Sequence, residues 1–360
     1  MKSRILTLLT AMTLFAALAI PVQTSAQIIK FNAPGAGTGS GQGTFPFDMN
    51  DWNSMTGYYT DANNVQHGFV RDPNGKITSF DPTGSVYTNG FSLNDWGAIT
   101  GYYLDADGVC HGFLRNPNGN ITAFDPTGST CTFSGNINVF GAIAGFYYDA
   151  SSVVHGFLLT PYGKMISFDA PGAGTGAGQG TFPEVATCLN SAGAITGNYV
   201  DANNVNHGFV RDPNGNIRTF DVKGAGTGSG QGTIPDSIND EGAIIGLYLD
   251  ANGVYHGFVR NPNGKITTFD VKGAGTGAGQ GTEVSTINDE GASDGIYIDA
   301  KGVYHGFVRD PNGKITTIDV RGAGTGSGQG TIAGILNQEG VIGGWYVDSS
   351  NVAHGFLGQP

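Results

Sequence analysis

The histidines of this chain set the strongest constraint on its fold, because every one of them is followed by Gly-Phe. They recur at intervals of 44, 44, 52, 49, 49 and 49 residues. Gly-x-Tyr-x-Asp precedes each histidine, and a segment such as Lys265–Asp270 follows all but the last. We number the repeats 1 to 7 by these histidines, which are His67, His111, His155, His207, His256, His305 and His354. Such a period predicts an array of one supersecondary unit.

Each repeat has the pattern of a four-stranded antiparallel meander. In residues 233–271, short runs rich in Val, Ile, Tyr, Phe and Thr alternate with Asn, Asp, Gly and Pro turns, which is typical of strands joined by tight hairpins. Glycine ends the NDEG and NPNG turns and supplies the positive φ that hairpin loops need. No stretch after residue 26 shows helical periodicity. A repeated unit of this size and strand number is typical of a propeller blade.

The strand count predicts how the array closes. Only four residues follow the His-Gly-Phe of repeat 7, so this repeat lacks its fourth strand. The segment Ile28–Asn32 matches that strand at the other end of the chain. A closed ring explains this permuted start, whereas an open solenoid would leave raw strand edges. We therefore predict an all-β fold, a single seven-bladed β-propeller over residues 27–360. Its blades are expected at about 44–82, 87–126, 130–170, 181–222, 233–271, 282–320, and 331–357 with 28–33.

Glycine-rich connectors join most of the repeats. GAGTGSGQGT or GAGTGAGQGT occurs at 35–44, 172–181, 224–233, 273–282 and 322–331, with glycine at every second residue. In an extended chain all these glycines lie on one side, which would let that side press against another backbone. A flexible linker is the equal alternative. The connector is replaced by Pro-Thr-Gly after repeats 1 and 2, so repeats 2 to 4 are the irregular sector.

The N-terminus predicts export. Lys2 and Arg4 precede the apolar run 5–20 and a small-residue site ending at Ala26, which is the pattern of a signal peptide over 1–26. No later segment is long and apolar enough to span a membrane, so we expect a secreted protein, periplasmic or extracellular. Three cysteines, Cys110, Cys131 and Cys188, allow one disulfide at most without identifying the pair, and the interpretation as small buried residues is favoured.

Seven copies of a short pattern carry a family resemblance. The Asn-x-x-Gly turn at 239–242, the Gly-x-Tyr-x-Asp segment, the His-Gly-Phe and the Asn-Gly turn resemble the bacterial HAF extracellular repeat family over residues 28–357. That family is named for His-Ala-Phe, so this chain resembles a variant branch. The resemblance implies export and repeat architecture, and it implies no activity and no catalytic residues.

The histidines and the aspartate turns are expected to be structural. One histidine per repeat, on the third strand, would lie too far from the others to share an ion. We expect each to be held by hydrogen bonds to the Asp250-type or the Asp270-type aspartate, because buried polar groups need partners. Turns such as 105–108 lack the carboxylate spacing of a strong Ca²⁺ loop, so they are interpreted as hairpin turns. A Ca²⁺ ion that serves stability alone is the alternative, and no other cofactor is expected.

Catalytic patterns are sparse in this sequence. It contains no G-x-S-x-G and no H-E-x-x-H, the connectors do not match a nucleotide-binding loop, and near-identical repeats suit multivalent binding better than an active site, which needs different groups at one point. The net charge of −12 argues against nucleic acid as a partner. Tryptophan, the usual sugar-stacking residue, occurs only at 52, 96 and 345.

We therefore predict a monomeric binding or scaffold module that is not an enzyme, with a glycan, a cell-wall polymer or a protein as ligand. The connectors and the Asp-Ala turns should share one rim, whose repeated polar groups are the ligand-binding candidates Gln42, Gln179, Gln231, Gln280 and Gln329. The alternative is a propeller hydrolase or lyase with its site at the axis mouth near repeats 2 to 4. Candidates for that site are Glu184, Asn89 and Thr187.

Overall fold

The computed structural model describes residues 28–183 and 187–359, and every regular element in them is a β-strand. The predicted signal peptide therefore lies outside the described residues. Within them, no helix is long and apolar enough to cross a membrane. The strands are β1 (Ile29–Phe31); β2 (Gly43–Met49), β3 (Met55–Thr60), β4 (Gln66–Arg71) and β5 (Ile77–Phe80); β6 (Ser85–Leu93), β7 (Ile99–Asp105), β8 (Cys110–Arg115) and β9 (Ile121–Phe124); β10 (Cys131–Ile137), β11 (Ile143–Tyr148), β12 (Val154–Leu159) and β13 (Met165–Phe168); β14 (Gly180–Pro183), β15 (Ile195–Val200), β16 (Asn206–Arg211) and β17 (Ile217–Phe220); β18 (Gly232–Ile238), β19 (Ile244–Leu249), β20 (Tyr255–Arg260) and β21 (Ile266–Phe269); β22 (Gly281–Ile287), β23 (Ser293–Ile298), β24 (Tyr304–Arg309) and β25 (Ile315–Ile318); and β26 (Gly330–Leu336), β27 (Ile342–Val347) and β28 (Ala353–Gly358).

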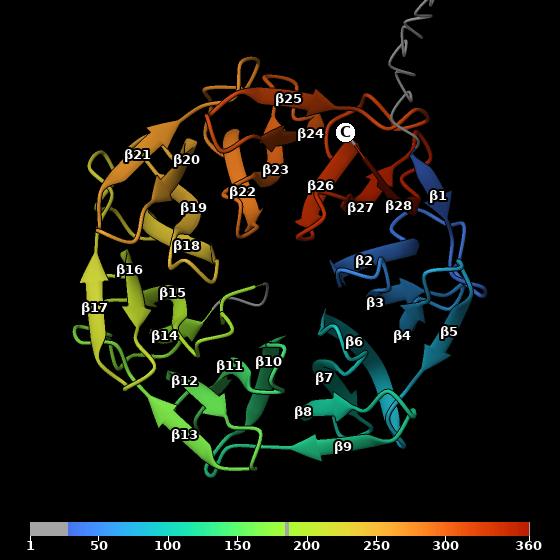
Figure 1. Ribbon diagram of the computed structural model, residues 1–360, viewed down its shortest axis with the longest axis horizontal. Helices are drawn as coiled ribbons and strands as arrows, with labels where there is room; N and C mark the ends of the chain where they lie inside the picture. The colour runs from blue at the N-terminus through green and yellow to red at the C-terminus, as the bar shows by residue number, and fades with distance from the viewer. Residues whose placement is uncertain (1–27, 184–186, 360) are drawn as a thin grey trace, which may run out of the picture.

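Successive strands of one repeat pair antiparallel, as the hairpin turns predict. In repeat 5, β18 pairs with β19, β19 with β20, and β20 with β21. The turn between β18 and β19 ends at Gly242 with φ of 81°, a conformation that costs glycine little. The first strand of each repeat lies near the common axis and the fourth lies outermost (Figure 1).

The two ends of the described chain meet in one sheet. β1 pairs antiparallel with β28, so that Lys30 lies opposite Phe356. The first strand β2 contacts β28 as well, through a parallel bridge between Gly43 and Ala353. The N-terminal strand thus supplies the outer strand that repeat 7 lacks (Figure 1).

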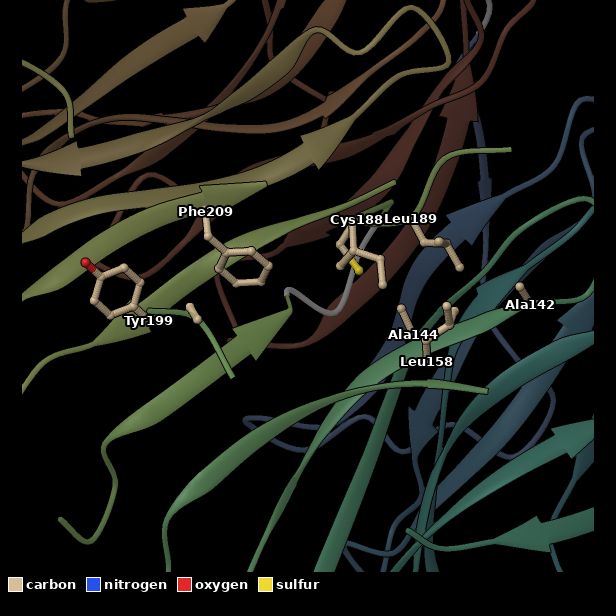
Figure 2. Packing of buried hydrophobic residues seen from close by; sticks show 9 residues of the cluster. Ala142, Ala144, Leu158, Cys188, Leu189, Tyr199 and Phe209 are labelled. Atoms are coloured by element: carbon tan, nitrogen blue, oxygen red, sulfur yellow. The ribbon is translucent and has the colours of Figure 1, made fainter. Parts of the chain in front are cut away.

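The core lies between neighbouring repeats. The phenylalanine of every His-Gly-Phe is completely buried, and these residues are Phe69, Phe113, Phe157, Phe209, Phe258, Phe307 and Phe356. Between repeats 3 and 4, Ala144 and Leu158 belong to one cluster with Cys188, Tyr199 and Phe209 (Figure 2). Strands are therefore apolar on both faces, because each face packs against a different neighbour.

The glycine-rich connectors press against another backbone, which decides between the two interpretations of their sequence. Gly281 forms a parallel bridge with Tyr255 of the preceding repeat, and a Cβ on Gly281 would lie 2.0 Å from the Tyr255 carbonyl oxygen. A Cβ would come equally close to a backbone carbonyl oxygen of the preceding blade at Gly43, Gly180, Gly232 and Gly330. Only glycine allows two strands to come this close at that point.

A disulfide takes the place of this glycine contact between repeats 2 and 3. Cys131 is the partner of Cys110 in the parallel bridge between β10 and β8, and the two cysteines form a disulfide. This corrects the expectation that all three cysteines are small buried residues, which holds for Cys188 alone. Sequence could not identify the pair because the register between neighbouring repeats is set by packing rather than by spacing.

Reduction of this disulfide is expected to lower the free energy of unfolding by about 3 kcal/mol, the usual effect of opening a loop of about this length. The bridge spans 21 residues at a junction that has no connector. Calorimetry with and without reductant measures the effect. The control is the double variant Cys110→Ser/Cys131→Ser, whose melting temperature should already be low and should not respond to reductant. Equal melting of the oxidised and reduced wild type would contradict this role.

Candidate functional site

Each repeat histidine is held by two polar partners and one aromatic ring. In repeat 5, His256 Nδ1 lies 2.8 Å from the Asp270 carboxylate, Nε2 lies 3.8 Å from Asp250, and the ring stacks on Tyr248 at 4.8 Å. Repeat 7 uses Asn32 of the N-terminal segment in place of the Asp270-type aspartate, at 3.0 Å. The Asp270-type aspartate is therefore a hydrogen-bond partner of the histidine in repeats 1 to 6. The Asp250-type carboxylate comes within hydrogen-bond distance in repeats 2 and 7 alone.

The charge environment of these histidines is clearest in repeat 2. Burial alone would lower the pKa of His111, but hydrogen bonds and charges from Asp125 and Asp105 outweigh burial and raise it. In repeat 5, backbone N–H groups of Val254 and Asn252 donate to the Asp250 carboxylate and hold its pKa below the usual range, although partial desolvation opposes them. The aspartates therefore cap their own turns. Within the described ranges, no group of three or more His, Cys, Asp or Glu residues could hold a metal ion.

The connector glutamines use both ends of their amides inside the fold. Gln280 Oε1 accepts a hydrogen bond from Gly277 N at 3.0 Å, and its Nε2 donates to the Ala300 carbonyl at 3.3 Å. Equivalent bonds occur at Gln42, Gln179, Gln231 and Gln329, with Asn64, Asn204 or Asn351 as partner in three of them. These side chains hold the connector against the adjacent turn through hydrogen bonds. Their geometry gives no support to the ligand-binding role predicted for them.

The two candidates for an enzyme site that the structure describes, Asn89 and Thr187, belong to different hydrogen-bond networks. Glu184 lies outside the described residues. Asn89 is buried, and its amide donates to the hydroxyls of Tyr87 and Tyr102 at 3.1 and 3.4 Å. Thr187 belongs to a different network and donates to Ser237 Oγ at 2.6 Å.

On the rim opposite the connectors, seven asparagines form a circle of hydrogen bonds. This circle was not predicted from the sequence. Each asparagine is the first residue of the turn after the axial strand, and its Nδ2 donates to the backbone carbonyl of the equivalent asparagine in the next repeat. The last one, Asn337, donates to the Asn50 carbonyl at 3.3 Å and completes the circle. The members are Asn50, Asn94, Asn138, Asn190, Asn239, Asn288 and Asn337. We call the surface formed by these seven turns the asparagine rim.

The asparagines also fix the shape of the turns that they begin. Asn239 Oδ1 accepts a hydrogen bond from Ala243 N at 2.8 Å, and equivalent bonds occur in the other turns. The second residue of each turn extends the circle where it is Asp or Gln: Asp240 N donates to Asp289, and Asp289 N donates to Gln338. The third residue of every turn is exposed, so it projects from a rigid base.

The third turn residue divides the asparagine rim into two halves. Three consecutive repeats carry large aromatic residues there, namely Trp52, Trp96 and Phe140, which are 67%, 73% and 69% exposed. We call these the aromatic arc. Repeat 4 has alanine, and the last three repeats carry the acidic arc of Glu241, Glu290 and Glu339. The common fold does not require these exposed aromatic residues, because the other four repeats have alanine or glutamate at the same turn position.

A cavity of about 170 Å³ opens at the centre of this rim. Six asparagines of the circle, all but Asn288, line the cavity together with the residues that precede the circle in each repeat. Among them is Asp48, whose pKa is raised to about 6 by burial, although hydrogen bonds from Leu93 N and Ser92 Oγ oppose the rise. Burial and neighbouring carboxylates also raise the pKa of Asp51 and Asp289. The lining of the cavity is thus acidic and polar, and the aromatic arc stands on the same rim outside that lining.

The sequence contained a signal for this site, namely a large aromatic residue at the third position of this turn in three neighbouring repeats. The turns read NDWN, NDWG and NVFG in repeats 1 to 3. A turn residue that is aromatic in three neighbouring repeats and acidic in three others is not needed for a common fold. Aligning the repeats by the turn rather than by the histidine would have shown the pattern.

Comparison with known proteins identifies the architecture. No family model matches this chain, and no curated protein matches it. Among solved structures, it is similar to streptogramin B lyase with a TM-score of 0.55 and 13% identity, over 92% of this chain and 97% of that one. It is similar to the β-propeller domain of the Trilobed protease from Pyrococcus furiosus with a TM-score of 0.56 and 8% identity, over 87% and 95%. At these identities the likeness concerns the fold alone, and it shows that the chain is a β-propeller.

Proposed function

We propose that this chain is an exported, non-enzymatic binding protein built as a closed seven-bladed β-propeller, in a variant branch of the HAF-repeat family. The pairing of β1 with β28 supports closure, as does the circle of asparagine hydrogen bonds. The signal-peptide pattern in residues 1–26 and the disulfide support export, because disulfides persist in oxidising compartments.

The ligand is a glycan chain, and it binds across the asparagine rim. The observation that carries this proposal is the aromatic arc, three exposed rings presented at the same turn position by three neighbouring repeats. Sugar rings have an apolar face that stacks on aromatic side chains and hydroxyl groups that donate to carboxylates and amides. Asp51 and Asp95 stand directly beside Trp52 and Trp96 in the sequence, so each tryptophan has an acceptor for such hydroxyls next to it.

A protein partner fits this surface less well than a glycan does. Protein interfaces concentrate their affinity in aromatic residues set in packed, desolvated pockets, whereas these three rings project separately from polar turns. A chain of similar units would instead contact the rings one after another, and several weak contacts in series give useful affinity.

The test is a panel of soluble glycans and cell-wall polysaccharides, with calorimetry on those that bind. Trp52→Ala and Trp96→Ala are each expected to weaken binding about tenfold, the effect of losing roughly 1.4 kcal/mol of contact. The matched control is Tyr162→Ala, which removes a 98% exposed aromatic residue outside the aromatic arc and should leave affinity unchanged. The proposal fails when no glycan binds, or when glycans bind equally well to both tryptophan variants.

A further inference from the structure

The asparagine rim carries an unusual density of negative charge. Asp51, Asp95, Asp240 and Asp289 occupy the second turn position in four repeats, and the acidic arc occupies the third position in three. The seven turns contain no Lys, Arg or His. The lysines on the same side of the molecule that precede the outermost strands β5, β13, β21 and β25 lie far from the axis. They are Lys76, Lys164, Lys265 and Lys314.

Backbone hydrogen bonds hold several of these carboxylates close to one another. Asp51 N donates to Asp95 Oδ1 at 3.1 Å, Gln338 N donates to Asp51 Oδ1 at 3.0 Å, and Asp240 N donates to Asp289 Oδ1 at 2.8 Å. The raised pKa values of Asp51 and Asp289 arise first from burial and then from neighbouring acids: Asp95, Glu339 and Asp289 act on Asp51, and Asp240 and Glu241 act on Asp289. A cation placed at this mouth would relieve that repulsion.

The aromatic arc adds a second preference for positive charge. The faces of tryptophan and phenylalanine rings attract ammonium groups, and the arc lies on the same rim as the carboxylates. An anionic polysaccharide would be repelled here. A neutral one would gain stacking and hydrogen bonds alone, whereas a glycan with ammonium groups would also gain the electrostatic attraction.

We propose that the glycan bound at the asparagine rim is a chain of hexosamine units with free amino groups, which stacks on the aromatic arc and directs its ammonium groups to the rim carboxylates. This inference rests on the proposed function and names the ligand class of the same site. It assigns the acidic arc to ligand selection and the aromatic arc to affinity.

The experiment compares two hexasaccharides with one β-1,4 backbone, glucosamine and N-acetylglucosamine, by calorimetry at mildly acidic pH and low salt. The glucosamine hexamer is expected to bind at least about tenfold more tightly, and added salt should reduce that advantage because it screens exposed charges. The triple variant Glu241→Gln/Glu290→Gln/Glu339→Gln should lose most of the advantage and keep its affinity for the acetylated chain. Asp107→Asn, an exposed carboxylate of a connector-side turn, is the matched control and should change neither affinity.

The outcomes separate this inference from the proposed function. Equal affinity for both hexamers, with loss of binding in Trp52→Ala, would overturn the amino-sugar inference and leave the glycan site in place. No binding of the glucosamine hexamer, while another glycan of the panel binds through Trp52 and Trp96, would do the same. Failure of the whole panel would overturn both.

Discussion

Gly281→Ala is expected to destabilise the protein by roughly 2 to 5 kcal/mol, the sum of overpacking and a disfavoured backbone conformation. Gly281 has φ of 127°, and its Cβ would lie 2.0 Å from the Tyr255 carbonyl oxygen and 2.8 Å from the Tyr255 nitrogen. Both of these atoms are backbone and belong to the bridge between β20 and β22, so neither can move without separating two repeats.

Gly279→Ala is the matched control, because it lies in the same connector with φ of 73° and nothing within 4 Å of the added Cβ. Gly279→Ala should lower the free energy of unfolding by about 1 kcal/mol, because only the backbone conformation is disfavoured. Thermal or denaturant unfolding of both variants measures the difference. Equal losses in the two variants would show that the connector is a loose linker rather than a packed strand contact.

Asp294→Thr is expected to stabilise the protein at neutral and alkaline pH by about 2 kcal/mol or more. Asp294 is completely buried between repeats 6 and 7, and burial raises its pKa to about 8 although Thr286 N donates to it. Its Oδ2 has no hydrogen-bond partner among the described residues. Repeats 1, 2 and 4 have threonine at this position, and its hydroxyl donates to the carbonyl of the buried phenylalanine on the next strand.

The pH dependence follows from the direction of this shift. Between pH 4 and pH 8 the unfolded chain has lost the Asp294 proton while the folded chain keeps it, so folding stability falls as pH rises, by at most about 1.4 kcal/mol per unit. The loss of folding stability caused by Asp294 is absent below the ordinary aspartate pKa, and it is complete above the pKa of Asp294 in the folded protein. Unfolding of wild type and Asp294→Thr across this range measures it, and subtraction cancels the common contributions of Asp48 and His111. A difference that does not grow with pH would contradict the assignment.

Much of the fold could be predicted because the same local sequence pattern recurs in every repeat. Alternation of β-formers with Asn-Gly turns gave the strands, and the segment Ile28–Asn32 gave the outer strand of repeat 7, which β1 supplies. The histidine partners followed from the aspartates that recur at fixed distances from each histidine. These features depend on local sequence, so one chain was enough to infer them.

The functional surface was harder to predict because it depends on contacts between repeats. The asparagine circle joins residues that are 44 to 52 positions apart in the sequence. Its last bond joins Asn337 to Asn50, which are 287 positions apart. The glutamines were repeated and polar, and this made them candidates, but the structure shows that their amides are engaged within the fold. A count of tryptophan over the whole chain does not reveal the aromatic arc, which is visible only when each residue is placed within its repeat.

A crystal structure of the protein with the glucosamine hexamer tests this account most directly. The account predicts sugar rings over Trp52 and Trp96, with amino groups directed to the carboxylates around the axial cavity. Density for the sugar on the connector side of the molecule, with the tryptophan rings left uncovered, would contradict it.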